Sequence, residues 1–275
     1  MNRMRYAEYH YGKNSSKSRF QITQQGNNVD ICREHRCIGN LNLDTMELQY
    51  ADSESFAFPL LIGKLQTLAE IRNGQSVTVY PGSVVFFTTI KWQIEDVLTL
   101  TYDLPSYVLA EVVKQSIREQ FAENDNLDDM AFLILQRPLE RDYPKFQLEL
   151  DSTFESIDYA RNQVTSFLSE YLKNSCVNLW CFQEMIVNAI EHGNRFSPDK
   201  KVRINVEVTE RHIMFVISDE GDGFNWRERI HKESCLLSSS ERGRGIVMSE
   251  MLCTYMIYNE IGNQVTIIFT YDEPI

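Results

Sequence analysis

The sequence has fewer basic than acidic residues, which argues against a protein that binds nucleic acid or anionic membranes. Lysine and arginine number 27 against 39 acidic residues, so the formal net charge is -12 over 275 residues. A chain with this charge repels nucleic acid and anionic membranes unless it holds a basic patch, and the sequence has no run of lysine and arginine long enough to form one. We therefore expect no direct contact with nucleic acid.

Long apolar runs and dense cysteines are also missing. No stretch approaches the roughly 18 residues that cross a bilayer, and the opening segment MNRMRYAEYHYGKNSSKSRF has no apolar core like that of a signal peptide. Six cysteines are too few for a disulfide scaffold in a chain of this length. Cys32, His35 and Cys37 lack a fourth ligand at a matching spacing, so we favour ordinary thiols over a zinc site. These features predict a cytoplasmic protein without a membrane segment.

The composition and length indicate a globular chain of one large or two small domains. Hydrophobic residues make up 43% and charged residues 24%, which excludes a wholly disordered chain. The segment 136–150, QRPLERDYPKFQLEL, has two prolines and several charges, as expected for a linker that leads into a strand. We predict a first domain over residues 1–138 and a second over residues 139–275.

The first domain is predicted to be rich in β-strands. CIGNLNLDTMELQYA indicates two strands around a turn at Leu43–Thr45, and SVTVYPGSVVFFTTI indicates two more around Pro81-Gly82. An apolar stripe at helical spacing predicts a helix over about 107–123, and AFLILQ predicts a final buried strand.

The second domain has a different order of elements. FQLEL predicts a strand, 152–173 an amphipathic helix, and 178–192 a second helix that is ended by Gly193 and Asn194. Two antiparallel strands, a polar loop, a helix from about Gly245 and a hairpin with its turn at Ile261–Asn263 follow. This order predicts an α+β fold, a two-layer α/β sandwich with the helices on one face of a mixed sheet.

Three polar residues of the second helix recur at one-turn intervals. Glu184, Asn188 and His192 stand at i, i+4 and i+8, which places them on one side of the helix. The apolar residues between them are predicted to point toward the core: Met185, Val187 and Ile190. A carboxylate and an amide oxygen one turn apart can serve as a base and as a ligand for a hard cation. Taken alone, the pattern is more typical of a polar helix face.

The second motif follows a predicted strand. An aspartate at this place, Asp219, can accept a hydrogen bond from an exocyclic amine, and Gly221 and Gly223 let the backbone approach a flat base. A plain glycine-rich turn is the alternative.

The third motif opens a predicted helix after the polar loop. The free N–H groups of a helix start bind anions, and the small residues Gly243 and Gly245 would expose them to phosphate oxygens. Arg242 and Arg244 could add positive charge. The alternative is a helix start with two chance glycines.

Together, in this order and spacing, the three motifs resemble the N, G1 and G2 boxes of the GHKL ATP-binding fold. By pattern, the segment from about Phe146 to Tyr271 resembles the bacterial anti-sigma-factor serine kinases. An N-box Glu followed by Asn and His-Gly is similar to that group. Sensor histidine kinases usually have a phosphoacceptor helix before this domain, and the sequence shows none.

This resemblance implies ATP and Mg²⁺ as cofactors and phosphoryl transfer as the chemistry. Asn188 would coordinate Mg²⁺, Glu184 would be the general base that takes the proton from an attacking hydroxyl, and Asp219 would bind the adenine amino group. No chemistry is assigned to His192, which would pack or form a hydrogen bond.

The resemblance also implies roles for the glycines. Gly221 and Gly223 would shape the floor of the base pocket. Gly243 and Gly245 would give backbone N–H groups to the phosphates, with Arg244 between them. The segment from about Asn225 to Arg242 would be a mobile lid.

The first domain resembles the later part of the metal-dependent serine/threonine phosphatase domains that accompany such kinases. Where that family ends a strand with Thr-Asp-Gly, this chain has Thr89-Ile90-Lys91, and only Asp128 and Asp129 of the metal carboxylates have counterparts. Two-metal hydrolysis needs several converging carboxylates. We therefore expect a degenerate, truncated regulatory domain rather than a phosphatase.

The leading hypothesis is an ATP-dependent protein serine/threonine kinase of a partner-switching circuit. The resemblance implies an anti-anti-sigma-like antagonist protein as its substrate, a sigma factor or another target as an alternate partner, and a homodimer. A non-catalytic ATP-binding switch or scaffold is the alternative. Nucleotide binding does not need a base, so the presence of Glu184 favours the kinase.

Overall fold

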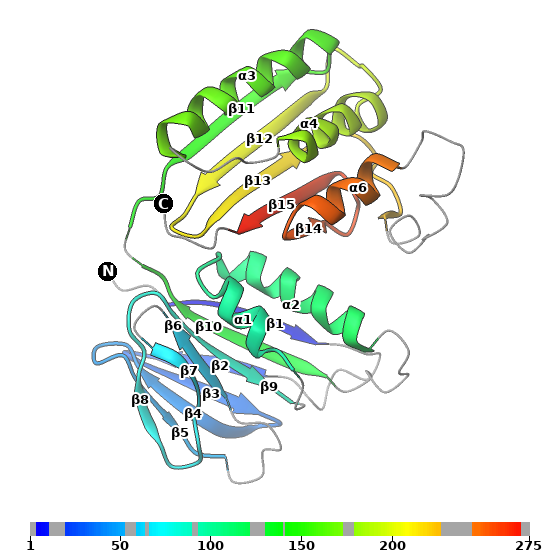
Figure 1. The fold of residues 1–275 in the computed structure, drawn as a ribbon. Helices are drawn as coiled ribbons and strands as arrows, with labels where there is room; N and C mark the ends of the chain where they lie inside the picture. The colour runs from blue at the N-terminus through cyan, green and yellow to red at the C-terminus, as the bar shows by residue number, and fades with distance from the viewer. Residues whose placement is uncertain are drawn as a thin grey trace. The chain divides into compact units, whose positions relative to one another are not determined.

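The computed structural model describes residues 4–10, 20–52, 59–63, 66–89, 93–121, 130–139, 141–172, 179–226 and 244–270. The chain divides into two compact units, Met1–Arg141 and Asp142–Ile275 (Figure 1). This division lies a few residues after residue 138, in the same charged, proline-containing segment. Among the helices described, none is long and apolar enough to cross a membrane.

Two five-stranded antiparallel sheets form the frame of the first unit. One has the strand order β1-β10-β9-β6-β7 and the other β2-β3-β4-β5-β8. The elements are, in chain order, β1 Arg5–His10, β2 Phe20–Gln25, β3 Asn28–Arg33, β4 Arg36–Asn42, β5 Glu47–Tyr50, β6 Leu60–Gly63, β7 Gln66–Glu70, β8 Ser76–Thr78, β9 Ser83–Thr88, α1 Glu95–Thr101, α2 Ser106–Phe121 and β10 Ala131–Arg137.

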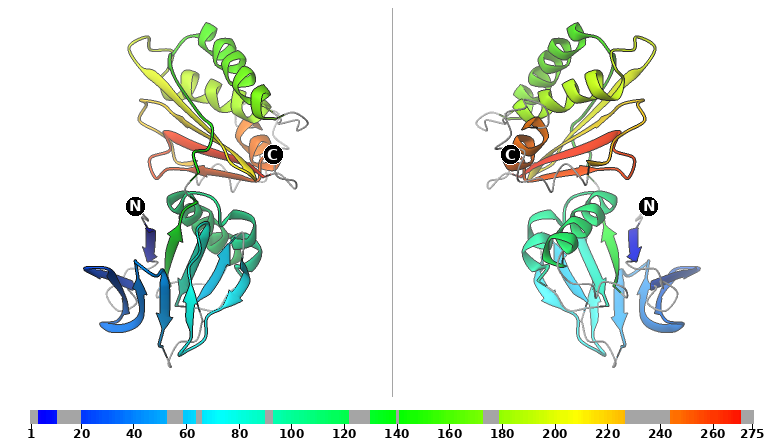
Figure 2. Two further views of the ribbon diagram at one scale, coloured as in Figure 1. Left: turned by 90° about the vertical axis from the view of Figure 1, so that its left-hand side faces the viewer. Right: turned by 90° about the vertical axis from the view of Figure 1, so that its right-hand side faces the viewer.

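Strand β9 shows why the central strands of this unit are apolar throughout. Val84 and Phe86 pack with residues of α1 and α2, whereas Val85 and Phe87 pack toward the second sheet. The first sheet is thus covered on both faces, with the helices on one side of it (Figure 2). A strand buried on both faces has an unbroken apolar run instead of alternation, which is the pattern that AFLILQ of β10 also has.

The strands predicted around residues 43–45 and around Pro81-Gly82 are confirmed as β4 with β5 and β8 with β9, and the predicted helix is α2. Several elements were not predicted: β1, β2, β3, β6, β7 and α1. Strand β2, FQITQQ, shows the reason, since most of its side chains are exposed and its apolar positions are too few for a clear period.

The second unit is a two-layer sandwich. Its sheet has the order β11-β12-β13-β15-β14, and the helices lie over one face of it (Figure 1, Figure 2). The elements are β11 Lys145–Asp151, α3 Phe154–Tyr171, α4 Trp180–Val187, the π-helical turn η2 Asn188–Gly193, β12 Lys201–Val208, β13 His212–Ser218, α6 Arg244–Leu252, β14 Tyr255–Tyr258 and β15 Gln264–Thr270. The predicted α+β class with a β-rich first part is confirmed.

The prediction of a mixed sheet in this unit is wrong. Each neighbouring pair of strands in the sheet is antiparallel. The connection from β11 to β12 holds the helices α3 and α4, and a crossover of that length suits a parallel pair as well as an antiparallel one. The sequence pattern therefore did not determine the strand direction here.

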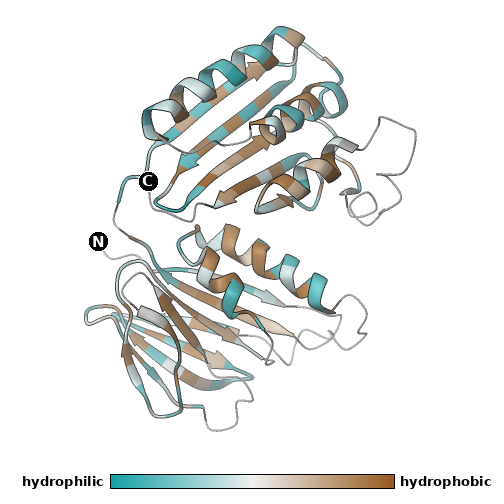
Figure 3. Cartoon of the chain, viewed as in Figure 1, coloured by the Kyte–Doolittle hydropathy of each residue, from teal (hydrophilic) through white to brown (hydrophobic). Residues whose placement is uncertain are grey.

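One face of the sheet and the inner faces of the helices make a single core. Along β12, Val202, Ile204 and Val206 are buried and the residues between them are polar, an alternation that can be followed in Figure 3. On α3, Ala160, Val164 and Leu168 are buried at four-residue spacing. Each element thus buries one apolar face, as an amphipathic strand or helix does.

Candidate functional site

A cavity of about 780 Å³ lies in the second unit, next to α4, η2 and the start of α6. Residues of all three sequence motifs line it: Glu184, Asn188, His192, Asp219, Gly223 and Gly245. The other motif residues with assigned roles are Gly221, Gly243 and Arg244. Gly221 packs behind Asp219, and Gly243 and the side chain of Arg244 lie outside the described residues, as does most of the predicted lid, 227–242.

The helix that presents Glu184 and Asn188 changes its winding between them. The segment is α-helical over Trp180–Val187 and π-helical over Asn188–Gly193, where the N–H of Asn194 donates to the Ala189 carbonyl at 2.8 Å. The sequence predicted one uniform helix. A π-helical turn inserts a residue into the turn, and such turns occur frequently at functional sites.

The apolar residues of this helix divide between the core and the cavity. Met185 and Ile190 belong to the core, as predicted. Val187 was predicted to point toward the core but is only half-buried and lines the cavity. The sulfur of Met185 accepts a hydrogen bond from the Tyr258 hydroxyl at 3.2 Å, which fixes one wall of the cavity.

Asp219 follows β13 and lies against the end of η2. Its carboxylate accepts a hydrogen bond from the Gly221 N–H at 2.8 Å, and its own N–H donates to the Asn263 carbonyl at 2.9 Å. Burial raises the pKa of Asp219, while the Gly221 N–H and the charge of Lys200 oppose this shift. A half-buried carboxylate with free acceptor capacity can bind a donor group of a ligand.

Two glycines allow the backbone around Asp219 to pack as closely as it does. A Cβ on Gly221 would lie 2.2 Å from the Gly193 carbonyl oxygen. Gly223 has φ +75, and a Cβ there would lie 2.1 Å from the carbonyl oxygen of Ile261. Any side chain at either place would push the two backbones apart.

Glu184 and Gly245 form a second close contact, between α4 and the first turn of α6. A Cβ on Gly245 would lie only 1.8 Å from Oε1 of Glu184. Burial raises the pKa of Glu184; the charge of His192 opposes the shift and that of Glu191 adds to it. The start of a helix has a partial positive charge, which suits a carboxylate or a phosphate at this place.

Two aromatic residues that line the cavity, Phe224 and Tyr258, were given no role by sequence reasoning. Phe224 and Trp226 contact Tyr258, with ring centroids 5.3 and 5.9 Å apart, and the Trp226 indole N–H donates to the Asn259 carbonyl at 2.9 Å. Through Trp226, the beginning of the predicted lid segment contacts Tyr258 at the end of β14 and the β14–β15 connection. The sequence predicted the hairpin turn at Ile261–Asn263. Nothing in the sequence indicated that this turn lies beside Gly223.

The raised pKa of Glu184 predicts a pH-dependent effect of Glu184→Gln on stability. A carboxyl whose pKa is higher in the folded than in the unfolded chain adds stability below the unfolded pKa, and this contribution is lost as the pH rises through the folded pKa. Glutamine does not ionise. We therefore expect Glu184→Gln to unfold at a higher temperature than the wild type near pH 7, and the gain to shrink toward about pH 4.

Thermal unfolding followed by circular dichroism at both pH values measures this difference. The exposed Glu170→Gln on α3 is the matched control. A gain for Glu184→Gln that is equal at both pH values, or absent at neutral pH, would contradict the assignment of a half-buried, destabilising carboxylate.

Comparison with known proteins bears on this site. Residues 155–269 match the family model of the histidine kinase-like ATPase domain. Among solved structures, the chain is similar to the RsbU and RsbW domains of a Mycobacterium tuberculosis protein, with 16% identity, a TM-score of 0.31, and coverage of 86% of this chain and 68% of that one. No curated protein matches the sequence. The matched segment, residues 155–269, holds the cavity and the residues that line it.

Proposed function

We propose that the second unit binds ATP with Mg²⁺ in this cavity and that the chain is a protein serine/threonine kinase of the anti-sigma-factor type. One observation carries the proposal: Glu184, Asn188, Asp219 and Gly245, which are separated in the sequence, line the same cavity. The match of residues 155–269 to an ATPase domain supports it independently.

The residues of the cavity fit a nucleotide. Asp219 accepts a hydrogen bond from the adenine amino group, and the close-packed backbone at Gly221 and Gly223 forms the base pocket. Gly245 lines the cavity and places no side chain of its own between it and the first turn of α6. The N–H groups of this helix start, with Gly243 and Arg244, contact the phosphates.

The Asn188 side chain fits a magnesium site. Its amide oxygen is a hard ligand of the kind that Mg²⁺ accepts beside phosphate oxygens and water. When bound, the ion neutralises charge on the phosphates. Asn188 lies one turn after Glu184 and lines the cavity with it, so the ligand and the base face the same reacting group.

Glu184 distinguishes a kinase from a passive ATP-binding switch. Its carboxylate takes the proton from a serine or threonine hydroxyl of the antagonist as that oxygen bonds to the γ-phosphorus and ADP leaves. A pKa raised by burial moves a carboxyl toward the working pH, which strengthens it as a general base. A non-catalytic switch needs no such residue.

The partners follow from this proposed activity. The substrate is an anti-anti-sigma-like antagonist protein, and a sigma factor or other target is the alternate partner of a partner-switching circuit. The excess of 39 acidic over 27 basic residues supports binding to a protein with basic surfaces rather than to nucleic acid. Self-association as a homodimer belongs to the same proposal.

The first unit is proposed to be a regulatory domain derived from a phosphatase that has lost its metal site. The support is in the sequence, where Ile90-Lys91 replaces a metal aspartate and its neighbour. These residues and Asp128-Asp129 lie outside the part of the chain that the structure describes.

Replacing Asp219 with asparagine is expected to weaken ATP binding by about 10- to 100-fold, because the amide can turn a donor toward the donor amine of adenine. Isothermal titration calorimetry with ATP and Mg²⁺ measures the affinity. The exposed neighbour Asp222→Asn is the control and should bind as the wild type does. Equal affinity in Asp219→Asn and the wild type would contradict the assigned base pocket.

Glu184→Gln should leave ATP binding intact and lower phosphoryl transfer by roughly 10²- to 10⁴-fold, the usual loss for a general base. Asn188→Ala should lower Mg²⁺-dependent binding and transfer together. The measurement is transfer of labelled γ-phosphate to candidate antagonist domains, with nucleotide affinity measured for each variant. If the wild type binds ATP tightly and labels no antagonist of its own genome, the switch replaces the kinase. If Glu184→Gln transfers at the wild-type rate, another group is the base.

The full chain is expected to release no phosphate from a phosphoserine peptide in the presence of Mn²⁺, because two-metal hydrolysis needs carboxylates that the sequence lacks. Phosphate release against a buffer blank is the readout. Turnover that disappears in Asp128→Asn would show that the first unit has retained a metal site.

A further inference from the structure

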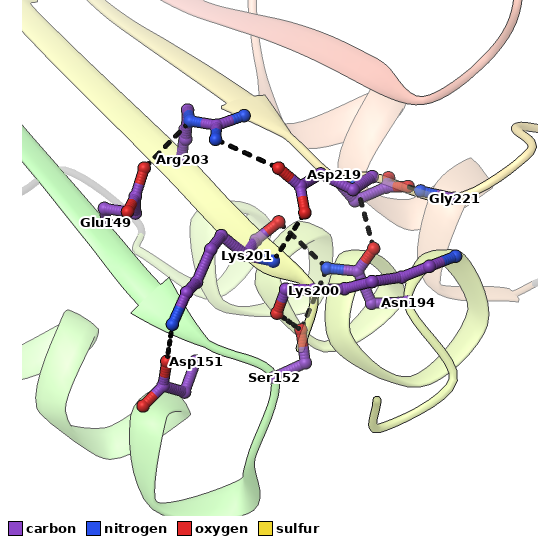
Figure 4. Close-up of polar contacts among 10 residues, drawn as sticks. Glu149, Asp151, Ser152, Asn194, Lys200, Lys201, Arg203, Asp219 and Gly221 are labelled. Atoms are coloured by element: carbon purple, nitrogen blue, oxygen red, sulfur yellow. Dashed lines mark hydrogen bonds and ion pairs between the residues drawn. The ribbon is translucent and has the colours of Figure 1, made fainter. Parts of the chain in front are cut away.

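Asn194 follows η2 and is a buried polar residue, with 1% of its surface exposed. Its side-chain N–H₂ donates to the hydroxyl of Ser152 at 2.9 Å and to the carbonyl of Lys201 at 2.9 Å, and its side-chain oxygen accepts from the Glu220 N–H at 2.8 Å (Figure 4). The three partners belong to three different segments, which Asn194 joins at one point.

The backbone of Asn194 is itself fixed. Its N–H closes the π-helical turn by donating to the Ala189 carbonyl, and its carbonyl accepts from the Ser197 N–H at 3.1 Å. The next two residues have φ +56 and +54, which bends the chain sharply away from the helix. The side-chain oxygen of Asn194 is therefore held at a set place relative to Asn188 and the rest of η2.

The Glu220 N–H belongs to the peptide that links Asp219 to Glu220. Asp219 is fixed on its other side by its N–H bond to the Asn263 carbonyl, and its carboxylate turns back to the Gly221 N–H. A Cβ on Gly193, the residue before Asn194, would lie 2.4 Å from Asp219 Cγ. The end of η2 thus contacts both the peptide and the carboxylate of Asp219.

An exposed ionic network also reaches this peptide. The Glu220 carboxylate accepts from the Lys201 N–H at 3.0 Å and pairs with Arg203 at 2.9 Å, and Arg203 also pairs with Glu149 (Figure 4). Ion pairs in solvent fix a geometry weakly because water and salt compete for them. The hydrogen bond from the Glu220 N–H is accepted by the buried side chain of Asn194, where water competes less for it.

Asparagine suits this place because an uncharged amide offers two donors and an acceptor in one plane. Aspartate keeps the acceptor for the Glu220 N–H and loses both donors. Serine is too short to reach the same three partners. Comparing aspartate with serine at position 194 therefore separates the effect of the acceptor from the effect of the donors.

We propose that Asn194 is a positioning residue for base recognition: its bond to the Glu220 N–H holds the Asp219 carboxylate where it meets the amino group of the base. This inference rests on the proposed binding of ATP. It adds to that function a residue that acts through Asp219 and does not itself contact the nucleotide.

The test uses the full chain and two nucleotides with Mg²⁺, ATP and the triphosphate of purine riboside, which has hydrogen in place of the amino group. Calorimetry gives the affinity for each. We expect the wild type to prefer ATP, and Asn194→Ser to lose at least about tenfold in ATP affinity while its affinity for the purine analogue stays within about twofold. Asn194→Asp should restore most of the preference for ATP, since it keeps the acceptor.

Two control variants separate positioning from general damage. Ser152→Ala removes one partner of the Asn194 amide and leaves the Glu220 contact, so its preference for ATP should be that of the wild type. Asn205→Ala changes an exposed asparagine on β12 and should bind both nucleotides as the wild type does. If Asn194→Ser does not fold by circular dichroism, Asn194→Asp decides, and loss of its preference for ATP overturns the proposal.

The outcomes distinguish this proposal from the proposed function. A wild type that binds neither nucleotide, or binds both equally, contradicts the assigned ATP pocket. A wild type that prefers ATP, together with an Asn194→Ser variant that loses affinity for both nucleotides to the same degree or for neither, overturns the positioning role alone.

Discussion

The part of the candidate site around Asp219 depends on how closely two stretches of backbone meet at the end of η2. The Gly193 carbonyl lies 2.2 Å from where a Cβ of Gly221 would be, and the Asp219 carboxylate fills the place of a Cβ on Gly193. Hydrogen bonds of normal length can form across this contact only because neither residue has a side chain. The Asn194 bond to Glu220 and the inward position of Asp219 both follow from that approach.

A second close approach combines charge and packing in the same cavity. Glu184 lies against Gly245 at the first turn of α6, where burial raises its pKa. The folded chain therefore holds an ionisable group in a place that penalises its charge. Groups with perturbed pKa values gather at functional sites because chemistry needs them there, whereas stability alone would select a neutral residue.

The sequence predicted those features that repeat or that belong to a motif. Alternating apolar and polar residues indicated β12, and apolar residues at four-residue spacing indicated α3. The order and spacing of the motifs assigned Glu184 and Asp219 to one site. The π-helical winding, the place of Val187 in the cavity wall and the Asn194 network were not predicted. Each of these features depends on a contact with a segment that is distant in the sequence. Such contacts produce no repeating pattern of residues from which they could be predicted. The antiparallel direction of β12 against β11 was missed because a long helical connection permits either direction.

The strand order of the second unit has a consequence for how the site is assembled during synthesis. β15 lies between β13 and β14 in the sheet, although both precede it in the chain. Until it inserts, β13 has no partner on that side and Asp219 lacks the Asn263 carbonyl that fixes its N–H. The cavity is therefore completed by a non-local pairing late in the chain, and folding of this unit on the ribosome waits for its C-terminal hairpin to emerge.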